Sequence, residues 1–273
     1  MIQEPDPIQP ENPPQENTAQ QNNASQNRRR GGVGAAVAAL AVLATKFAIV
    51  LKILAPSWTF LLSLFFYVAF FGWRLGVVIL LVIAAHELGH YFAYRAYGLA
   101  ARLPVFVPFF GAYTQGALAP DLEQDAYIAL AGPLTGLALA AVCYGVGIAT
   151  GDRFWIACAD ISAFLNLFNM IPVLPFDGGR IIGAVWPPLW IVGAVVFIAA
   201  AVWLHVPIVL VAIIALLGVP AMLATYRGNV DPRVAAMSNA ARARVGFWYI
   251  ATSLALIVLV GQARAGMPAN NGL

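Results

Sequence analysis

The residues from Leu75 to Gly98 form an apolar run long enough to cross a lipid bilayer as a helix, and the run contains the sequence HELGH. Such a helix would reach about 35 Å, and the hydrocarbon core of a bilayer is about 30 Å thick. His86 and His90 are four residues apart, so both side chains leave the same helix face one turn apart and can share one metal ion. Glu87 lies beside them and can hold and deprotonate a water molecule without being a ligand. The run therefore predicts a metal site inside a membrane helix.

A five-residue pattern of this kind also arises by chance, and its setting decides between the two interpretations. Ionisable side chains at the centre of a membrane helix cost at least about 2.5 kcal/mol each, so their presence there indicates a function. The chain has three histidines in all, and two of them are His86 and His90. These observations favour a metal site over a chance match.

The composition is that of a multi-pass membrane protein. Of the 273 residues 61% are hydrophobic and 10% are charged, whereas soluble domains carry about 25% charged residues. The expected fold is all-α, with about six transmembrane helices and an additional N-terminal interfacial helix. The basic residues stand between the apolar runs and form no stripe, so the lipid bilayer is an expected partner and nucleic acid is not.

The N-terminal part of the chain differs from the rest. Residues 1–30 are polar and contain almost no apolar side chain, which is typical of a disordered tail. Residues 31–56 are apolar but contain Lys46 and Lys52, so they form either an interfacial helix or an additional membrane helix. The expected boundaries are a tail over 1–30, this helix over 31–56, a membrane domain over 57–262 with its core at 75–185, and a C-terminal tail over 263–273.

The positions of the arginines predict the orientation in the membrane. Arg28, Arg29 and Arg30 form a cluster just before the first apolar run, and such clusters remain on the cytoplasmic side. We therefore expect an integral membrane protein whose N-terminus is cytoplasmic. The same topology brings the HELGH end and the Asp177 end to the cytoplasmic side together, as a shared metal ion requires.

The segment near residues 103–116 interrupts the helical pattern. It combines prolines and glycines with residues that favour strands, so an extended or hairpin structure is expected. One interpretation is a simple connecting loop. The other is an exposed strand edge that pairs with an extended peptide.

A second polar cluster lies in the sequence NLFNMIPVLPFDGGR, which runs from Asn166 to Arg180. Asn166, Asn169 and Asp177 stand here among apolar residues, and the prolines between them break the helix. Broken helices with a carboxylate inside a membrane protein are typical of ion or substrate sites. A catalytic zinc ion takes three protein ligands, and the two histidines leave one ligand to be supplied. Asp177 is the best candidate for this third ligand.

The two motifs together resemble the site-2 protease family of intramembrane zinc metalloproteases. The resemblance rests on HELGH at 86–90, on Asn169-x-x-Pro172 followed by Asp177-Gly178, and on AGP at 131–133 between them. The resemblance covers roughly residues 75–185. The family member that it implies is a minimal form without a PDZ-like insertion. The chain departs from the family at Gly136, where a polar residue often follows AGP.

This resemblance implies a zinc metalloendopeptidase that hydrolyses a peptide bond in or near a transmembrane segment of a membrane protein. One catalytic zinc ion would be bound by His86, His90 and Asp177, and Glu87 would be the general base. Asn169 would hydrogen-bond the substrate carbonyl or the developing oxyanion. The strand-like region, represented by Gly111 and Gly116, would lie beside the site and bind unwound substrate.

Two other functions use the same residues. A metal transporter would need further ligands along a path, and the apolar runs offer almost none beyond His205. A catalytically idle scaffold could keep the zinc site, but such a site has no need of Glu87. Cleavage of a single-span substrate, with and without a chelator, separates these functions from proteolysis.

Overall fold

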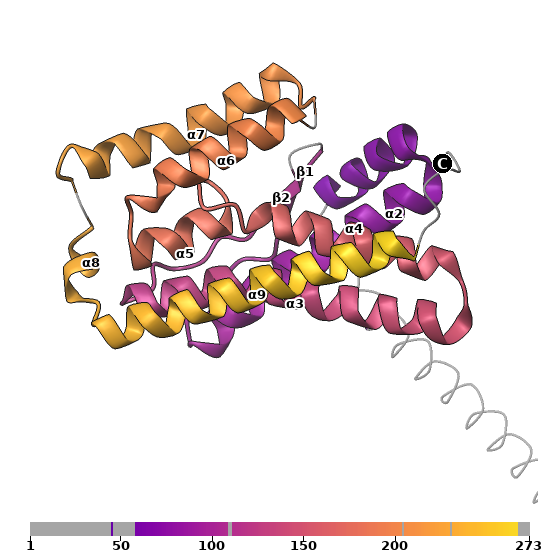
Figure 1. Ribbon diagram of the computed structural model, residues 1–273, viewed down its shortest axis with the longest axis horizontal. Coiled ribbons are helices and arrows are strands. Elements are labelled where there is room, and N and C mark those ends of the chain that lie inside the picture. Colours follow the sequence, from indigo (N-terminus) through magenta and orange to yellow (C-terminus); the bar gives the residue numbers. More distant parts are fainter. Residues whose placement is uncertain (1–44, 46–57, 109–110, 204, 230, 267–273) are drawn as a thin grey trace, which may run out of the picture. The chain divides into compact units, whose positions relative to one another are not determined.

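The computed structural model describes residue 45 and residues 58–108, 111–203, 205–229 and 231–266 (Figure 1). The predicted tail over 1–30, nearly all of the predicted helix over 31–56 and most of the predicted C-terminal tail lie outside these residues. The described part from residue 58 onward is mostly helical. Its helices are α2 (Trp58–Ala96), α3 (Leu122–Thr150), α4 (Arg153–Asn169), α5 (Asp177–Val185), α6 (Leu189–Trp203), α7 (Ile208–Tyr226), α8 (Pro232–Ala236) and α9 (Asn239–Ala265).

Three of the described helices, α2, α3 and α9, are long and apolar enough to cross a membrane. The helices α6 and α7 are apolar but shorter. The structure thus confirms a mainly helical chain that has helices long and apolar enough to span a membrane, together with a small sheet. It does not confirm the predicted number of about six transmembrane helices.

Helix α2 consists of two helical pieces that meet at Gly72, whose φ of +77° is non-helical and suits glycine. A Cβ atom on Gly76 would lie 2.6 Å from backbone atoms of Tyr67, so the second piece folds back against the first. The sequence has one apolar run from Trp58 to Gly72 and another that begins at Leu75, and the structure joins them by this sharp turn without a loop. The second piece carries the HELGH sequence.

The strand-like segment is a small antiparallel hairpin, as predicted. Strand β1 (Val105–Val107) pairs with β2 (Gly111–Tyr113), with Phe106 opposite Ala112. The Phe106 ring packs edge-on against Phe60 of α2 at a centroid distance of 5.0 Å. The hairpin is therefore anchored by apolar contacts on the first piece of α2, and the second piece of the same helix carries the histidines.

Helix α3 contacts α2, α4, α5 and α9 and is the centre of the packing. It begins at the N-cap Asp121, whose carboxylate accepts a hydrogen bond from the Gln124 backbone N–H at 2.8 Å. A glycine of α2 allows close approach to α3: a Cβ atom on Gly89 would lie 2.5 Å from the Ala131 carbonyl oxygen of α3. The HELGH glycine is thus needed for packing against α3.

Helix α9 begins earlier than the sequence indicates. The sequence from Tyr226 to Arg244 is polar and predicts a loop before a last span that begins at Val245. This prediction is wrong, because Ser238 caps a helix that starts at Asn239. Arg242 and Arg244 in its first turns both make tertiary contacts, and of the two only Arg244 stays exposed. Arg242 donates hydrogen bonds to the carbonyls of Ala184 and Val185, at the C-terminal end of α5.

Candidate metal centre

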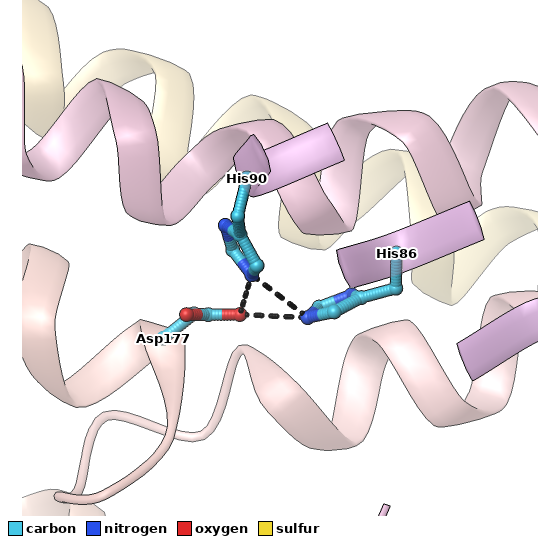
Figure 2. A group of neighbouring side chains, drawn as sticks. All are labelled: His86, His90 and Asp177. Atoms are coloured by element: carbon cyan, nitrogen blue, oxygen red, sulfur yellow. Dashed lines mark hydrogen bonds and ion pairs between the residues drawn. The ribbon is translucent and has the colours of Figure 1, made fainter. Parts of the chain in front are cut away.

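Three buried side chains meet at one point between α2 and α5 (Figure 2). His86 and His90 come from α2, and Asp177 is the first residue of α5. The two Nε2 atoms are 3.0 Å apart, and Oδ2 of Asp177 lies 3.0 Å from Nε2 of His86 and 3.1 Å from Nε2 of His90. The three atoms form a nearly equilateral triangle that faces a common centre.

This triangle fits a single zinc ion. Ligand atoms at about 2.0–2.2 Å from a tetrahedral zinc ion lie about 3.3 Å from one another. The observed separations of 3.0 and 3.1 Å are close to that value. Two imidazoles and one carboxylate are also a ligand set that zinc prefers. The residues that the sequence predicted as ligands can therefore hold one metal ion.

The other ring nitrogen of each histidine has its own hydrogen-bond partner. Nδ1 of His90 lies 2.7 Å from the carbonyl oxygen of Ile128 on α3. A carbonyl only accepts, so this Nδ1 carries the proton and Nε2 keeps its lone pair for a metal ion. Nδ1 of His86 lies 2.7 Å from Oδ1 of Asn166 on α4. Each imidazole is thus fixed by a helix that does not carry it.

The turn between α4 and α5 brings Asp177 to the histidines. Gly178 and Gly179 pack so tightly against this turn that a Cβ atom on either would overlap the backbone of residues 170–174. Two adjacent glycines after Asp177 predict a sharp turn of the backbone. Neither is among the described residues with positive φ, so their role here is close packing.

Glu87 and Asn169 line a cavity of about 510 Å³ together with the three candidate ligands. Glu87 is buried, with 7% of its surface exposed, and Asn169 is the last residue of α4. A smaller adjoining cavity of about 100 Å³ is lined by Glu87, Asn169 and Gly111 among others. Gly116, also predicted to bind substrate, packs against the Tyr94 ring and lines a different cavity. The candidate ligands, Glu87 and Asn169 therefore line one cavity, Gly111 lines the adjoining one, and Gly116 lines neither.

The hairpin presents backbone groups to this cavity. The backbone N–H of Phe106 donates to Oγ1 of Thr59 at 3.3 Å and so points away from β2. In an antiparallel pair the opposed residues either exchange both backbone hydrogen bonds or point both pairs of groups outward. The Phe106–Ala112 pair is of the second kind, so the N–H and C=O of Ala112 face away from β1. Ala112 lines the same cavities as Glu87.

Arg180 connects the centre to α3. Its Nη2 atom donates to Oδ1 of Asp125 at 3.0 Å, and its Nη1 atom lies 3.8 Å from Oδ1 of Asp177. In the sequence, Asp125 stands close to two other acidic residues in a pattern that is typical of a solvated helix start. It instead pairs with the arginine beside the candidate ligand, which the sequence did not reveal.

Sequence reasoning gave no role to Asn166 or to the Ile128 carbonyl. Asn166 is 1% exposed in an apolar setting, and a buried amide there is a signal in itself. The Ile128 carbonyl could not be singled out from the sequence, because every residue has a backbone carbonyl. Only the packing of α3 against α2 reveals it.

The fold and the site define a helical membrane protein with a buried centre of two histidines and one aspartate. Residues 75–152 match the family model described as Peptidase family M50. Rip3 of Mycobacterium tuberculosis (strain H37Rv) is 33% identical over 132 residues, which cover 43% of this chain and 33% of Rip3. Zinc metalloprotease MJ0392 of Methanocaldococcus jannaschii is 28% identical over 120 residues, which cover 41% of this chain and 34% of that protein. The chain thus matches about a third of the length of each of these relatives. The comparisons confirm the resemblance to the site-2 protease family.

Proposed function

We propose that this chain is an intramembrane zinc metalloprotease that hydrolyses a peptide bond in or near a transmembrane segment of a membrane protein. The observation that carries the proposal is the triangle of His86, His90 and Asp177 with Glu87 on the wall of the same cavity. The match to peptidase family M50 and the similarity to zinc metalloprotease MJ0392 support the same chemistry.

The roles of the residues follow from their chemistry. A bound zinc ion supplies a Lewis acid that polarises the scissile carbonyl and lowers the pKa of water. Glu87 accepts a proton from the attacking water and passes it to the leaving amine. The side-chain N–H groups of Asn169 donate hydrogen bonds to the oxygen on which negative charge develops. His86, His90 and Asp177 hold the ion, and Glu87 remains free to act as the base.

The substrate binds as an extended strand along β2. The N–H and C=O of Ala112 face outward beside Glu87. The N–H can donate to a carbonyl of an extended peptide, and the C=O can accept from one of its N–H groups. A transmembrane helix hides its own carbonyls in internal hydrogen bonds, so the substrate unwinds locally before it binds. Strand addition repays part of that cost because new backbone hydrogen bonds replace the lost ones.

Part of the wall of the larger cavity is apolar and suits a membrane-derived peptide. It is formed by Ile213, Ile214 and Leu217 of α7, together with Val206 just before that helix. When a transmembrane segment unwinds, its apolar side chains can exchange contact with lipid for contact with this wall, so they are not exposed to water. The arginine distribution in the sequence supports a cytoplasmic N-terminus and cleavage near the cytoplasmic face.

The test uses the purified full chain in lipid vesicles with a single-span protein substrate. Wild-type protein should cleave it, and a chelator should stop cleavage until zinc is returned. Glu87→Gln should keep zinc and lose cleavage, whereas His86→Ala should lose both. Normal cleavage by the zinc-loaded Glu87→Gln protein would overturn the proposed role of Glu87.

The same vesicles distinguish the two other functions. Zinc flux into the vesicles that is independent of Glu87 would support a transporter. Zinc binding without cleavage of any single-span substrate would support an idle scaffold.

A further inference from the structure

The side chain of Asn166 connects a candidate metal ligand to two other helices. Its Oδ1 atom lies 2.7 Å from Nδ1 of His86, and its Nδ2 atom donates to the Ser162 carbonyl at 2.7 Å. Ser162 in turn donates from Oγ to the Gly136 carbonyl of α3 at 2.9 Å. Asn166 is 1% exposed and Ser162 is fully buried, so water does not compete for these groups.

The Nδ2 contact decides how the amide is turned. Because Nδ2 donates to the Ser162 carbonyl, Oδ1 is the atom that faces His86, and it can only accept. Nδ1 of His86 therefore carries the proton, and the lone pair of this ring lies on Nε2, the atom that points at Asp177 and His90. A flipped amide would place its oxygen against the Ser162 carbonyl oxygen, and because both only accept, that hydrogen bond would be lost.

Gly136 provides the space that the amide occupies. A Cβ atom at this position would overlap the carboxamide of Asn166. The amide thus reaches His86 from α4 only because α3 has no side chain here. The two residues form a matched pair, with the polar group on one helix and the gap on the other.

We infer that Asn166 is the positioning residue of the metal centre: it holds His86 in the tautomer and orientation that direct Nε2 to the ion, and Gly136 makes room for it. This inference rests on the metal site of the proposed function and not on proteolysis. A positioning partner of a ligating histidine typically changes metal affinity by about 10- to 100-fold when it is removed. Asn166 lines the smaller cavity beside Glu87, but it is 1% exposed and both atoms of its amide are bonded to protein groups, so its effect should appear in zinc binding.

The first test compares two substitutions at Asn166 with one at Asn169, three residues further along α4. Zinc dissociation constants are measured on the full chain in detergent by competition with a chelator. Asn166→Leu removes the acceptor at similar volume and should weaken zinc binding by about 10- to 100-fold. Asn166→Asp keeps an acceptor for His86 and should bind zinc as tightly as wild type or more tightly. Asn169→Leu should leave zinc affinity within about threefold of wild type while cleavage falls.

A merely structural role gives a different pattern. If Asn166 acted only through its N–H bond to the Ser162 carbonyl, Asp and Leu would weaken zinc binding equally, and this result would overturn the inference. Wild-type zinc affinity in the Leu variant would overturn it as well. Thermal unfolding of the zinc-free proteins shows whether each variant is folded, and if Leu is not, the affinity of the Asp variant decides alone.

The second test leaves Asn166 in place. Gly136→Ala should displace the amide and weaken zinc binding to a similar degree as Asn166→Leu. Gly261→Ala in α9 is the matched control, because nothing lies within 4 Å of a Cβ atom there, and its zinc affinity should equal that of wild type. Unchanged zinc binding in a folded Gly136→Ala protein would contradict the pairing. Loss of cleavage by all proteins with zinc affinities as expected would overturn the proposed protease function and leave this inference standing.

Discussion

Nε2 of His90 and Oδ2 of Asp177 lie 3.1 Å apart although the two residues are separated by 87 positions in the chain. His90 is on the second piece of α2, and Asp177 starts α5 after a turn that two glycines allow to pack tightly. Without a metal ion or protons, two imidazole lone pairs and a carboxylate at these distances repel one another. A bound cation would remove this repulsion, so the arrangement favours cation binding.

Zinc binding should stabilise the folded chain through this triangle. A ligand that binds only the folded state at a hundred times its dissociation constant contributes about 2.7 kcal/mol. Thermal unfolding in detergent should therefore shift upward when zinc is added to the metal-free protein. Asp177→Asn should largely abolish the shift, and Asp160→Asn, at an exposed contact with Arg264, should retain it. An equal shift in both variants would argue against Asp177 as a ligand.

Gly132→Ala should disturb the centre from the side of α3. A Cβ atom at this position would overlap the His90 ring and lie 2.9 Å from the His86 ring, so both imidazoles would have to move. Overpacking of this kind costs about 1–3 kcal/mol. We expect a lower unfolding temperature and weaker zinc binding. Gly145→Ala on the same helix meets nothing within 4 Å and should be neutral or slightly stabilising, so an equal loss in both variants would contradict the prediction.

Arg242→Gln should destabilise the fold by loosening α5. Arg242 donates to the carbonyls of Ala184 and Val185, which end the helix that begins with Asp177, and hydrogen bonds from charged groups contribute about 1.5–3 kcal/mol. Chemical unfolding in detergent would measure the loss. Arg264→Gln is the control, because its exposed ion pair with Asp160 is worth at most about 1 kcal/mol. Equal effects of the two substitutions would show that α5 does not depend on Arg242.

Ala112→Pro should reduce cleavage without affecting zinc binding. The N–H of Ala112 faces away from β1, and proline removes this donor from the edge that we propose for substrate. We expect kcat/KM to fall at least about tenfold, since a main-chain hydrogen bond to an extended peptide is lost. Ala112→Ser keeps the donor and should behave as wild type. Full activity of the proline variant, measured on the same single-span substrate, would exclude binding of substrate along this edge.

The sequence alone determined the chemical elements of the site. The four-residue spacing of His86 and His90 placed both imidazoles on one helix face, and Asp177 was the candidate carboxylate that followed a broken helix. The hairpin near residues 103–116 was predicted because prolines and glycines excluded a helix there. These conclusions depend on local periodicity and composition, which the residue order contains directly.

The tertiary structure decided what surrounds the ligands. The contacts of Asn166 with His86, of the Ile128 carbonyl with His90 and of Asp125 with Arg180 join helices that are far apart in the chain. No local pattern encodes them, because they depend on how closely the helices approach, and that distance is set by glycines such as Gly136 and Gly89. The order of residues thus identified the atoms that can bind a metal ion. Only the packing of α3 and α4 against α2 determined which nitrogen of each ring is free to do so.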